Sequence, residues 1–490
     1  MNQLAIVTEI RPRRFVVLCL PAYLTLFAIA LQNSLGPLLH GRVPPDLGYA
    51  ADASWMLQFC QIACFAWLFA VYAWALLSWT RGEVTVRELA PAIVVLTVAA
   101  WTLLPANSSD ILEYLGLGRL AGVYGLNPYT HTYSEITDAF SSYVTWDDPM
   151  PYGPPMLPLF VGAALLSVRH VLLGIYGLKL AWAALHLLNS WLVYRIALSL
   201  TDDAACALFA FGCNPLILIE LVGNGHNDAL PILCGLCAVL AVQRRRGATA
   251  LLVAFIGAVM KLAGIVWVAA VIALLVRRKA WRALLWGSTA CAAAALVVAL
   301  WPGCLGALTV LNSQWHYSED SLHTIIIDRA VAIWSHVSSA ADYDRVFDTD
   351  RLIATPAFLV FLVWRLRRIR DVGSLVGESG VVFLVLLLLY AVSIGPWYFT
   401  WVLPMAALAG SARVRRTIFV ACASAIALYA FPFAAVETAH RHEFWASVRL
   451  LIALGVPIAF GLGYPLWVRA WHIARGAGVL AIPAPVPEQP

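Results

Sequence analysis

Long runs of hydrophobic residues, separated by short polar segments, cover most of the chain between residues 15 and 468. A transmembrane helix needs about 20 mostly apolar residues. The pattern therefore predicts an all-α polytopic membrane protein with about 11–14 transmembrane helices, some of them broken or re-entrant. The apolar runs lie at 15–35, 54–79, 89–105, 171–194, 204–222, 229–243, 249–276, 281–301, 352–364, 379–395, 398–411, 417–436 and 447–468, with a shorter one near 155–168.

The composition agrees with a membrane protein, since 62% of the 490 residues are hydrophobic and only 12% are charged. A large soluble domain is therefore not expected. The first apolar run follows three arginines, at positions 11, 13 and 14. With about 21 apolar residues it is longer than the apolar part of a signal peptide, so we expect it to stay as the first helix.

Basic residues predict the orientation of the chain, because Lys and Arg accumulate in short cytoplasmic loops. Placing the basic clusters on one face leaves five segments on the extracytoplasmic face: 106–152, 223–228, 303–350, 395–397 and 437–446. The net charge of +5 reflects this bias rather than a nucleic-acid surface. The basic clusters that bound apolar runs are Arg81 and Arg87, Arg244–Arg246, Arg277–Lys279, the RLRRIR run at 365–370, and Arg413, Arg415 and Arg416.

Two apolar runs do not fit a simple crossing. Residues 249–276 would make a helix of about 42 Å, too long for a hydrocarbon core of about 30 Å. Because both ends carry basic clusters, we predict a hairpin of two short helices with Lys261 near its turn. We further predict a partly inserted helix at 155–168 followed by one crossing at 171–194. The alternative, a full hairpin over 155–194, would invert everything downstream.

The domain organisation is expected to be simple. Residues 1–475 should form one transmembrane domain, with extracytoplasmic loops at 106–152 and 303–350. The proline-rich segment 476–490, which ends in AIPAPVPEQP, is expected to be a disordered cytoplasmic tail.

The first long loop carries a group of polar residues directly after an apolar run, in the stretch NSSDILEYLGLGRLAGVYGLNPYTHTY at 107–133. Asp110, Glu113 and Tyr114 would share one face of a short helix by their spacing. A carboxylate would then lie at the membrane surface. The alternative is that the Ser-Ser-Asp triplet only caps an interfacial helix.

A second polar stretch, WDDPMPYGPPMLP at 146–158, precedes the partly inserted helix. Its prolines prevent regular helix, and the freed backbone groups need protein or a water-filled cavity to satisfy them. The alternative is a rigid loop that starts the next helix.

The stretch LVGNGHNDAL at 221–230 places four polar side chains between two apolar runs. Asn227 or Asp228 could cap the following helix, which would explain part of the cluster but not His226. A helix N-terminus beside a histidine also suits a phosphate. Lys261 and, more weakly, Lys179 could reach the same place, since a lysine inside a membrane is by default a functional candidate. Snorkelling of Lys261 to an interface is the competing explanation.

The stretch SIGPWYFTWVLP at 393–404 places aromatic side chains at an outer helix end. Trp397, Tyr398 and Trp401 could belong to an ordinary aromatic belt. Because Gly-Pro breaks the helix at the same point, they could equally form a wall on which a sugar ring or a lipid stacks.

The chain also carries a family resemblance between residues about 105 and 410. It resembles the actinobacterial polyprenyl-phosphate-mannose-dependent α-1,6-mannosyltransferases and their relatives, polytopic glycosyltransferases of the GT-C fold. The stretches that carry the resemblance are, in order, SSDILEYLGLGRLAGVYGLNPYT, PYGPPMLPL, NPLILIELVGNGHNDAL and GPWYFTWVLP. Ser109 stands where the family pattern usually has Arg, so another cation would have to replace any contact of that Arg with the donor phosphate.

The resemblance implies a GT-C-like bundle with a large catalytic first loop. It implies transfer of a hexose, mannose in the first instance, from a polyprenyl-phosphate donor to an extracytoplasmic glycan or glycolipid acceptor. The protein would lie in the cytoplasmic (inner) membrane with its active site facing outward. Displacement of a β-linked lipid phosphate inverts the anomeric carbon and needs one base, since the phosphate leaves as an anion.

Roles follow for the polar residues. Asp110 is the expected base, with Glu113 and Tyr114 positioning it or the acceptor. We expect the donor phosphate to be bound by His226, Asn227, Lys261 and Lys179. We expect the sugar or the acceptor to contact Asn127, Tyr129, Asp148, Tyr152, Asp228, Trp397 and Tyr398.

No cofactor and no metal are expected, although the adjacent Asp147 and Asp148 leave a divalent ion open. The paired cysteines lie within apolar runs and are expected to be core residues rather than zinc ligands: Cys60 with Cys64, and Cys234 with Cys237.

A transporter or flippase for polyprenyl-linked sugars or lipids is the alternative function, because it too would have broken helices and an intramembrane lysine. The sequence shows no two-fold repeat, and the long first loop exceeds what a permeation path needs. A third possibility is an enzyme-like relative that has become a binding partner.

Overall fold

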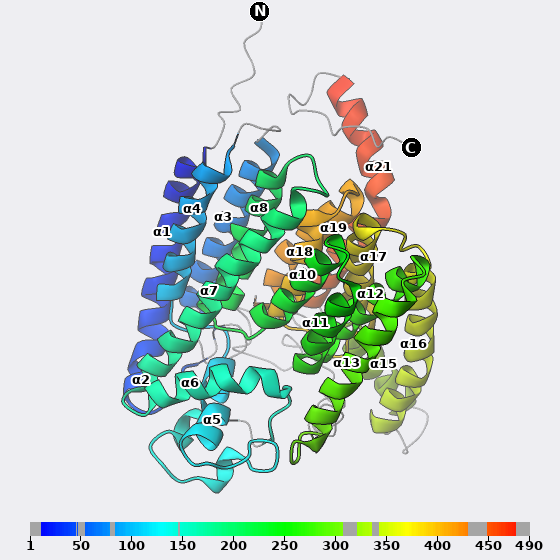
Figure 1. Cartoon of the computed structure of the whole chain (residues 1–490). Helices are drawn as coiled ribbons and strands as arrows, with labels where there is room; N and C mark the ends of the chain where they lie inside the picture. The colour runs from blue at the N-terminus through cyan, green and yellow to red at the C-terminus, as the bar shows by residue number, and fades with distance from the viewer. Residues whose placement is uncertain are drawn as a thin grey trace, which may run out of the picture.

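The computed structural model describes residues 11–45, 47, 54–78, 84–145, 148–306, 321–335, 343–429 and 448–476. All the regular elements in these ranges are helices. Figure 1 shows them as a bundle in which the start of α1 (Pro12–Ala30) and the end of α21 (Val456–Gly476) lie at one end, while α5 (Asp110–Gly122) and α6 (Leu157–Ser167) lie at the other. The all-α membrane architecture predicted from the apolar runs is confirmed.

The first group of helices comes from the N-terminal half. Helix α1 continues through a π-helical turn, Leu31–Leu35, into the short α2, Gly36–Leu39. It packs on α3 and α4, and α7 packs on α4 and α8. The first apolar run is therefore an integral part of this group. The helices are α1 (Pro12–Ala30), α3 (Trp55–Ser78), α4 (Val86–Thr102), α7 (Val171–Ala197) and α8 (Ala204–Gly212).

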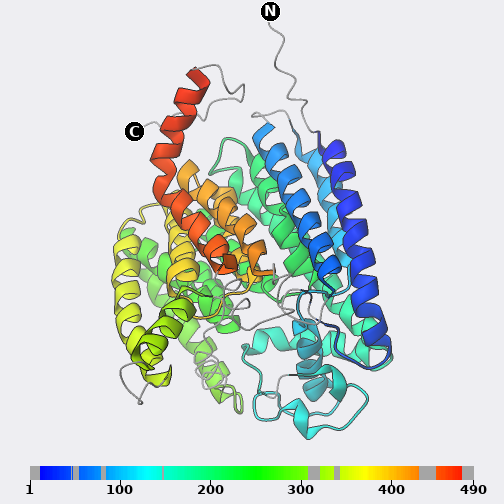
Figure 2. The ribbon, with the colours of Figure 1, turned by 180° about the vertical axis from the view of Figure 1, so that it is seen from behind.

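The second group lies beside the first and follows it in the chain. Helix α10 packs on α7, and α18 packs on α8, so these two contacts join the groups. Figure 2 shows α21 (Val456–Gly476) against α19 (Ala412–Ser424) on the other side of the molecule. The remaining helices of this group are α10 (Ala229–Gln243), α11 (Gly247–Met260), α12 (Ile265–Arg277), α13 (Trp281–Leu300), α15 (Leu322–Ser335), α16 (Tyr343–Leu366), α17 (Val372–Val385) and α18 (Leu403–Leu408).

Six helical segments in the described ranges are long and apolar enough to cross a membrane, or seven if the bent pair Ala204–Gly212 and Pro215–Gly223 is one span. This count by length and composition is lower than 11–14, because several apolar runs form shorter helices such as α10, α11 and α12. Only 6% of the apolar stretch of α13 is buried within the protein. An exposed apolar surface of this kind is suited to contact with lipid.

The predicted hairpin over 249–276 is confirmed as α11 and α12. Gly247, at the start of α11, lies so close to Leu275, near the end of α12, that an added Cβ would be 2.5 Å from Leu275 Cδ2. At the other end of the hairpin, a Cβ added at Gly264 would lie 2.6 Å from the backbone nitrogen of Ala258. Lys261 lies at the turn, between Met260 and the 3-10 helix Leu262–Gly264.

The segment before α7 forms one short helix, and partial insertion of that helix before a single crossing by α7 stays a prediction. A 3-10 turn, Pro154–Met156, leads into α6, Leu157–Ser167. A helix of this length spans about 16 Å, half of a bilayer core. Figure 1 shows α6 lying across the end of the bundle beside α5 (Asp110–Gly122), while α7 runs along it.

The basic loops meet at the end of the bundle opposite α5. Arg245 and Arg278, from the loops after α10 and α12, line one cavity together with Val372 at the start of α17. The segment expected as a loop at 303–350 contains α15, and the helix expected at 352–364 already begins at Tyr343. Hydropathy detects only the apolar part of a helix, so the charged first turns at 344–351 were not assigned to it. Segment 437–446 and most of the proline-rich tail lie outside the described residues.

Candidate active site

Asp110 is the first residue of α5, after the segment 103–109 that follows α4. Its backbone N–H donates to Ser108 Oγ at 3.2 Å. Asn107, just before, accepts a hydrogen bond of 2.6 Å from Gln61 Nε2 of α3. The start of α5 is therefore tied both to its own loop and to the first helix group.

Tyr114 lies one turn after Asp110 and donates from Oη to Asp110 Oδ2 at 3.1 Å. Its ring stacks on Phe160 of α6, with centroids 5.0 Å apart. Glu113, expected on the same face, instead accepts hydrogen bonds from the Thr145 backbone at 2.7 Å and the Thr145 hydroxyl at 2.6 Å. It therefore contributes to the conformation of the first loop.

His226 reaches Asp110 from the short segment between a π-helix, Leu218–Gly223, and α10. Its Nδ1 lies 3.3 Å from Asp110 Oδ2, and its side chain is fully buried. The imidazole stacks on Trp397 with centroids 4.1 Å apart and an interplanar angle of 17°. Gly225, the preceding residue, has φ +84°, a conformation that suits glycine and turns the chain toward α5.

Asp228 precedes α10 as its N-cap residue, but its side chain makes no cap hydrogen bond. Its Oδ1 instead accepts from Lys261 Nζ at 2.6 Å and from Trp401 Nε1 at 2.7 Å. The Lys261 ammonium also lies 5.6–5.8 Å from the ring centroids of Tyr152, Tyr398 and Trp401. The Lys261 ammonium is therefore surrounded by three aromatic rings and paired with a buried carboxylate.

These contacts form a closed circuit, which we call the site ring. Asp110 and Lys261 retain 19% and 12% exposure of their side chains, whereas His226 and Asp228 retain none. The accessible part of the ring thus offers one carboxylate, one ammonium and aromatic rings. In order of contact, the site ring is Asp110, Tyr114, Tyr152, Lys261, Asp228, Trp401, Tyr398, Trp397 and His226.

The charges of the Asp110–His226 pair reinforce each other. Burial lowers the pKa of His226, but the neighbouring carboxylates of Asp110 and Glu220 outweigh it and raise this pKa to about 9. Burial raises the pKa of Asp110, but the contact with His226 outweighs it, so this pKa falls below its ordinary value. At neutral pH the pair is therefore an imidazolium and a carboxylate.

Three predicted residues bond the backbone of other segments and are not members of the ring. Asn127 donates from Nδ2 to the Pro302 carbonyl at 2.6 Å, which ties the first loop to the end of α13. Tyr129 donates from Oη to the Tyr152 carbonyl at 2.8 Å. Lys179 is fully buried and donates to the carbonyls of Trp101, at 2.8 Å, and Leu103. Lys179 thus binds the end of α4 rather than joining the ring.

Two other predicted residues differ in their environment. Asn227 is fully buried, and neither polar atom of its side chain has a hydrogen-bond partner among the described residues. Asp148 is exposed and lies outside the ring contacts. Asp147 lies outside the described residues. Within the described ranges, no group of three or more His, Cys, Asp or Glu side chains is arranged to hold a metal ion.

Sequence reasoning missed Glu220 as a site residue. Its side chain is fully buried, and its Oε2 lies 3.4 Å from His226 Nε2. The same oxygen accepts from Tyr429 Oη at 2.7 Å and from Asn224 Nδ2 at 3.2 Å. The available signal was a lone acid inside the apolar stretch LILIELVG, since an ionisable residue at such a place is rarely without function.

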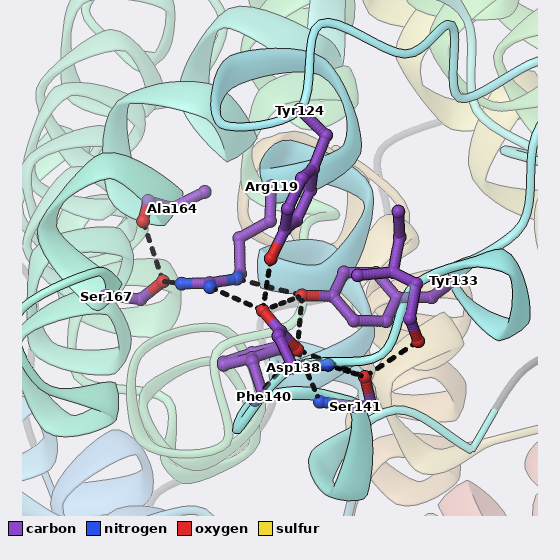
Figure 3. A network of polar contacts seen from close by, with 9 residues as sticks. Arg119, Tyr124, Tyr133, Asp138, Phe140, Ser141, Ala164 and Ser167 are labelled. Atoms are coloured by element: carbon purple, nitrogen blue, oxygen red, sulfur yellow. Dashed lines mark hydrogen bonds and ion pairs between the residues drawn. The ribbon is translucent and has the colours of Figure 1, made fainter.

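A second polar network holds α5 in place from its far end (Figure 3). Arg119 donates to Tyr133 Oη at 2.9 Å and to Ser167 Oγ of α6 at 3.2 Å, and it forms an ion pair of 2.8 Å with Asp138. Asp138 also accepts from Tyr124 Oη. Because Asp110 is on the same helix, this network helps to fix the position of the carboxylate.

Two models of known protein families match the chain, one in each half. A family model described as alpha-(1->6)-mannopyranosyltransferase, N-terminal domain, matches residues 25–277, and one described as MptB C-terminal domain matches residues 330–435. The first match contains Asp110, His226 and Lys261, and the second contains the three aromatic ring members at 397–401.

Individual relatives carry the same name. The alpha-(1->6)-mannopyranosyltransferase A of Mycobacterium tuberculosis is 27% identical over 358 residues, which cover 69% of this chain and 68% of that protein. The protein of the same name from Corynebacterium glutamicum is 29% identical over 165 residues, 32% of each chain. No solved structure matches. Since the first family model covers more than half of its residues, the chain belongs to the alpha-(1->6)-mannopyranosyltransferase family.

Proposed function

We propose that the chain is a membrane glycosyltransferase that moves mannose from a polyprenyl-phosphate donor to a hydroxyl of an extracytoplasmic glycan or glycolipid, with Asp110 as the base. One observation carries this proposal. Residues 110, 226, 261 and 397, which are far apart in the sequence, meet in one ring that contains a partly exposed carboxylate.

The proposed reaction needs a single base. The acceptor oxygen attacks the anomeric carbon, the bond from that carbon to the phosphate oxygen breaks, and the lipid phosphate leaves with the bonding electrons. The proton of the acceptor hydroxyl passes to Asp110. Tyr114 and His226 both contact Oδ2 of Asp110, which orients the carboxylate that receives the proton. Attack opposite the leaving group inverts the anomeric carbon.

Lys261 is the cation best placed for the donor phosphate. Its side chain is partly exposed, and an ammonium stabilises the charge that develops on a leaving phosphate. It would share its protons between the phosphate and Asp228. His226 was expected at the phosphate, but both of its nitrogens face carboxylates, so we assign it to the Asp110 side of the reaction instead.

The aromatic members of the ring suit a sugar. Tyr152, Tyr398 and Trp401 surround the ammonium and are each partly exposed, so a hexose ring could stack on them beside its own phosphate. The basic loops lie at the opposite end of the bundle from α5. By the positive-inside rule this supports a site on the extracytoplasmic face of the inner membrane.

The test is a transfer assay with purified protein in lipid, radiolabelled polyprenyl-phosphate-mannose and a mannoside acceptor. We expect a lengthened product from the wild type. Asp110→Asn should reduce kcat by about 10²–10⁴-fold, the usual contribution of a general base. Glu135→Gln, in an exposed part of the same loop, is the matched control and should remain active.

Two results would contradict the proposal. Asp110→Asn with most of its activity would remove Asp110 as the base. Reconstituted vesicles that moved a labelled polyprenyl lipid across the bilayer, without any acceptor and without transfer, would support the transporter instead.

A further inference from the structure

The buried carboxylate of Glu220 has no role in the proposed transfer step. It lies in the π-helix Leu218–Gly223, which continues the bent apolar segment after α8. Its side chain has no solvent exposure. A buried carboxylate is strongly unfavourable unless charged or hydrogen-bonding partners surround it, so its partners indicate its function.

Those partners connect Glu220 directly to the proposed base. Glu220 Oε2 faces His226 Nε2 at 3.4 Å, and His226 Nδ1 faces Asp110 Oδ2 at 3.3 Å. On its other side Oε2 accepts from Tyr429 Oη at 2.7 Å and from Asn224 Nδ2 at 3.2 Å. The imidazole thus lies between two carboxylates, one fully buried and one partly exposed.

This arrangement specifies the protonation state of His226. A neutral imidazole carries one N–H and can serve only one of two flanking carboxylates, whereas an imidazolium serves both. Trp397 covers one face of the ring at 4.1 Å, which fixes its plane. Two carboxylates and one imidazolium leave the trio with one negative charge, and the acceptor proton arriving on Asp110 brings it to zero.

Other charged groups near His226 already have partners of their own. Lys261 forms an ion pair with Asp228 at 2.6 Å. Lys179, whose Cγ lies near Gly225, donates to carbonyls at the end of α4. Asp110 from α5 and Glu220 from the π-helix are therefore the anions that face the imidazole in the described part of the chain.

We propose that Glu220 is a positioning residue that holds the His226 imidazolium against Asp110, and that this carboxylate–imidazolium–carboxylate chain sets the orientation and the charge of the base. The inference rests on the proposed function for its catalytic consequence. Tyr114 and His226 both contact Oδ2 of Asp110, and these two contacts orient the carboxylate that receives the acceptor proton.

The first experiment is a pH–rate profile of the full chain in lipid. Wild-type transfer should decline on the alkaline side near pH 9, where His226 loses its proton. Glu220→Gln removes one of the two anions that favour the imidazolium, so the alkaline limb should move to lower pH by about one unit or more. Glu378→Gln is the matched control, since it removes a carboxylate paired with Arg365 at 2.5 Å in another part of the bundle. Its alkaline limb should stay where the wild type has it.

The second experiment needs no activity. The pKa of folded His226, about 9, is above its ordinary 6.5. Its contribution to stability is therefore present below about pH 6.5 and is lost as the pH rises through 9. The drop in melting temperature caused by Glu220→Gln should be large at pH 6.5 and smaller at pH 9.5. In a His226→Asn background the same substitution should cause a smaller drop at pH 6.5.

The outcomes separate this inference from the proposed function. A wild type that transfers no mannose refutes the proposed function, while the melting experiment still tests the trio. An alkaline limb that does not move in Glu220→Gln, or a drop in melting temperature that is equal in both backgrounds and at both pH values, overturns the role of Glu220. If Glu220→Gln does not fold, a folded His226→Asn/Glu220→Gln double variant supports the charge coupling, and an unfolded double variant counts against it.

Discussion

The Lys261–Asp228 pair allows the charge arrangement of the site ring to be tested quantitatively. In Lys261→Met, the fully buried Asp228 carboxylate loses its ion pair and keeps the hydrogen bond from Trp401 Nε1 at 2.7 Å. Removing one partner of a buried ion pair costs about 3–5 kcal/mol, and the 12% exposure of Lys261 places this pair near the lower value of about 3 kcal/mol. The melting temperature should therefore fall by several degrees.

A double variant isolates the charge from the loss of packing. Asp228→Asn together with Lys261→Met removes both charges and leaves an amide that Trp401 can still reach. We expect it to recover at least half of the stability that Lys261→Met alone loses. Lys279→Met, at an exposed position in the loop between α12 and α13, is the matched control and should melt like the wild type.

The donor KM of the same variants is a second measurement. A hydrogen bond to a charged group contributes about 1.5–3 kcal/mol, so Lys261→Met should raise the donor KM by about tenfold or more.

Melting can be followed with a thiol-reactive dye, because six of the ten free cysteines are buried in the folded protein. Wild-type melting and wild-type donor KM in Lys261→Met would refute both roles of the lysine, and a double variant as unstable as the single one would refute the charge pairing.

Two further predictions concern the parts that position the ring. Gly225→Ala should lower the free energy of unfolding by about 1–2 kcal/mol, because alanine is strained in the left-handed backbone conformation of this residue. It should also lower kcat, since the new Cβ would lie 2.6 Å from Ile111 Cδ1, next to Asp110; an unchanged kcat would show that the site tolerates this displacement. Burial raises the pKa of Asp138, but hydrogen bonds from Tyr124 and Arg119 outweigh it and lower this pKa to about 2. Its contribution is therefore present above about pH 3.8 and lost as the pH falls through 2, so the melting difference between wild type and Asp138→Asn should shrink from pH 5 to pH 2, and a constant difference would contradict the ion pair with Arg119.

Hydropathy and charge along the chain were enough to predict the membrane bundle and the hairpin of α11 and α12. Both follow from local transfer free energies: apolar runs partition into lipid, and basic clusters at both ends of a run that is too long force it to return. The short helices were harder to count, because α10 and α11 are apolar without the length of a full crossing.

The sequence by itself also indicated which polar segments matter, since Asp110, His226 and Lys261 are ionisable residues next to apolar runs. It could not determine how their side chains pair. Glu113 has the helical spacing to accompany Asp110, yet it bonds Thr145, because the fold of the first loop decides which partner is nearer.

Only the tertiary structure decided that His226 lies between two carboxylates and that Lys261 shares Asp228 with Trp401. Those contacts join residues up to 173 positions apart, as between Asp228 and Trp401, and the bond from Tyr429 to Glu220 spans 209 positions. The energy of a polar contact depends on distances of a few ångströms and on exclusion of water, and a linear sequence fixes neither until the helices pack. Residue types and their membrane depth are thus encoded locally, whereas protonation, pairing and the accessible face of the base are consequences of packing.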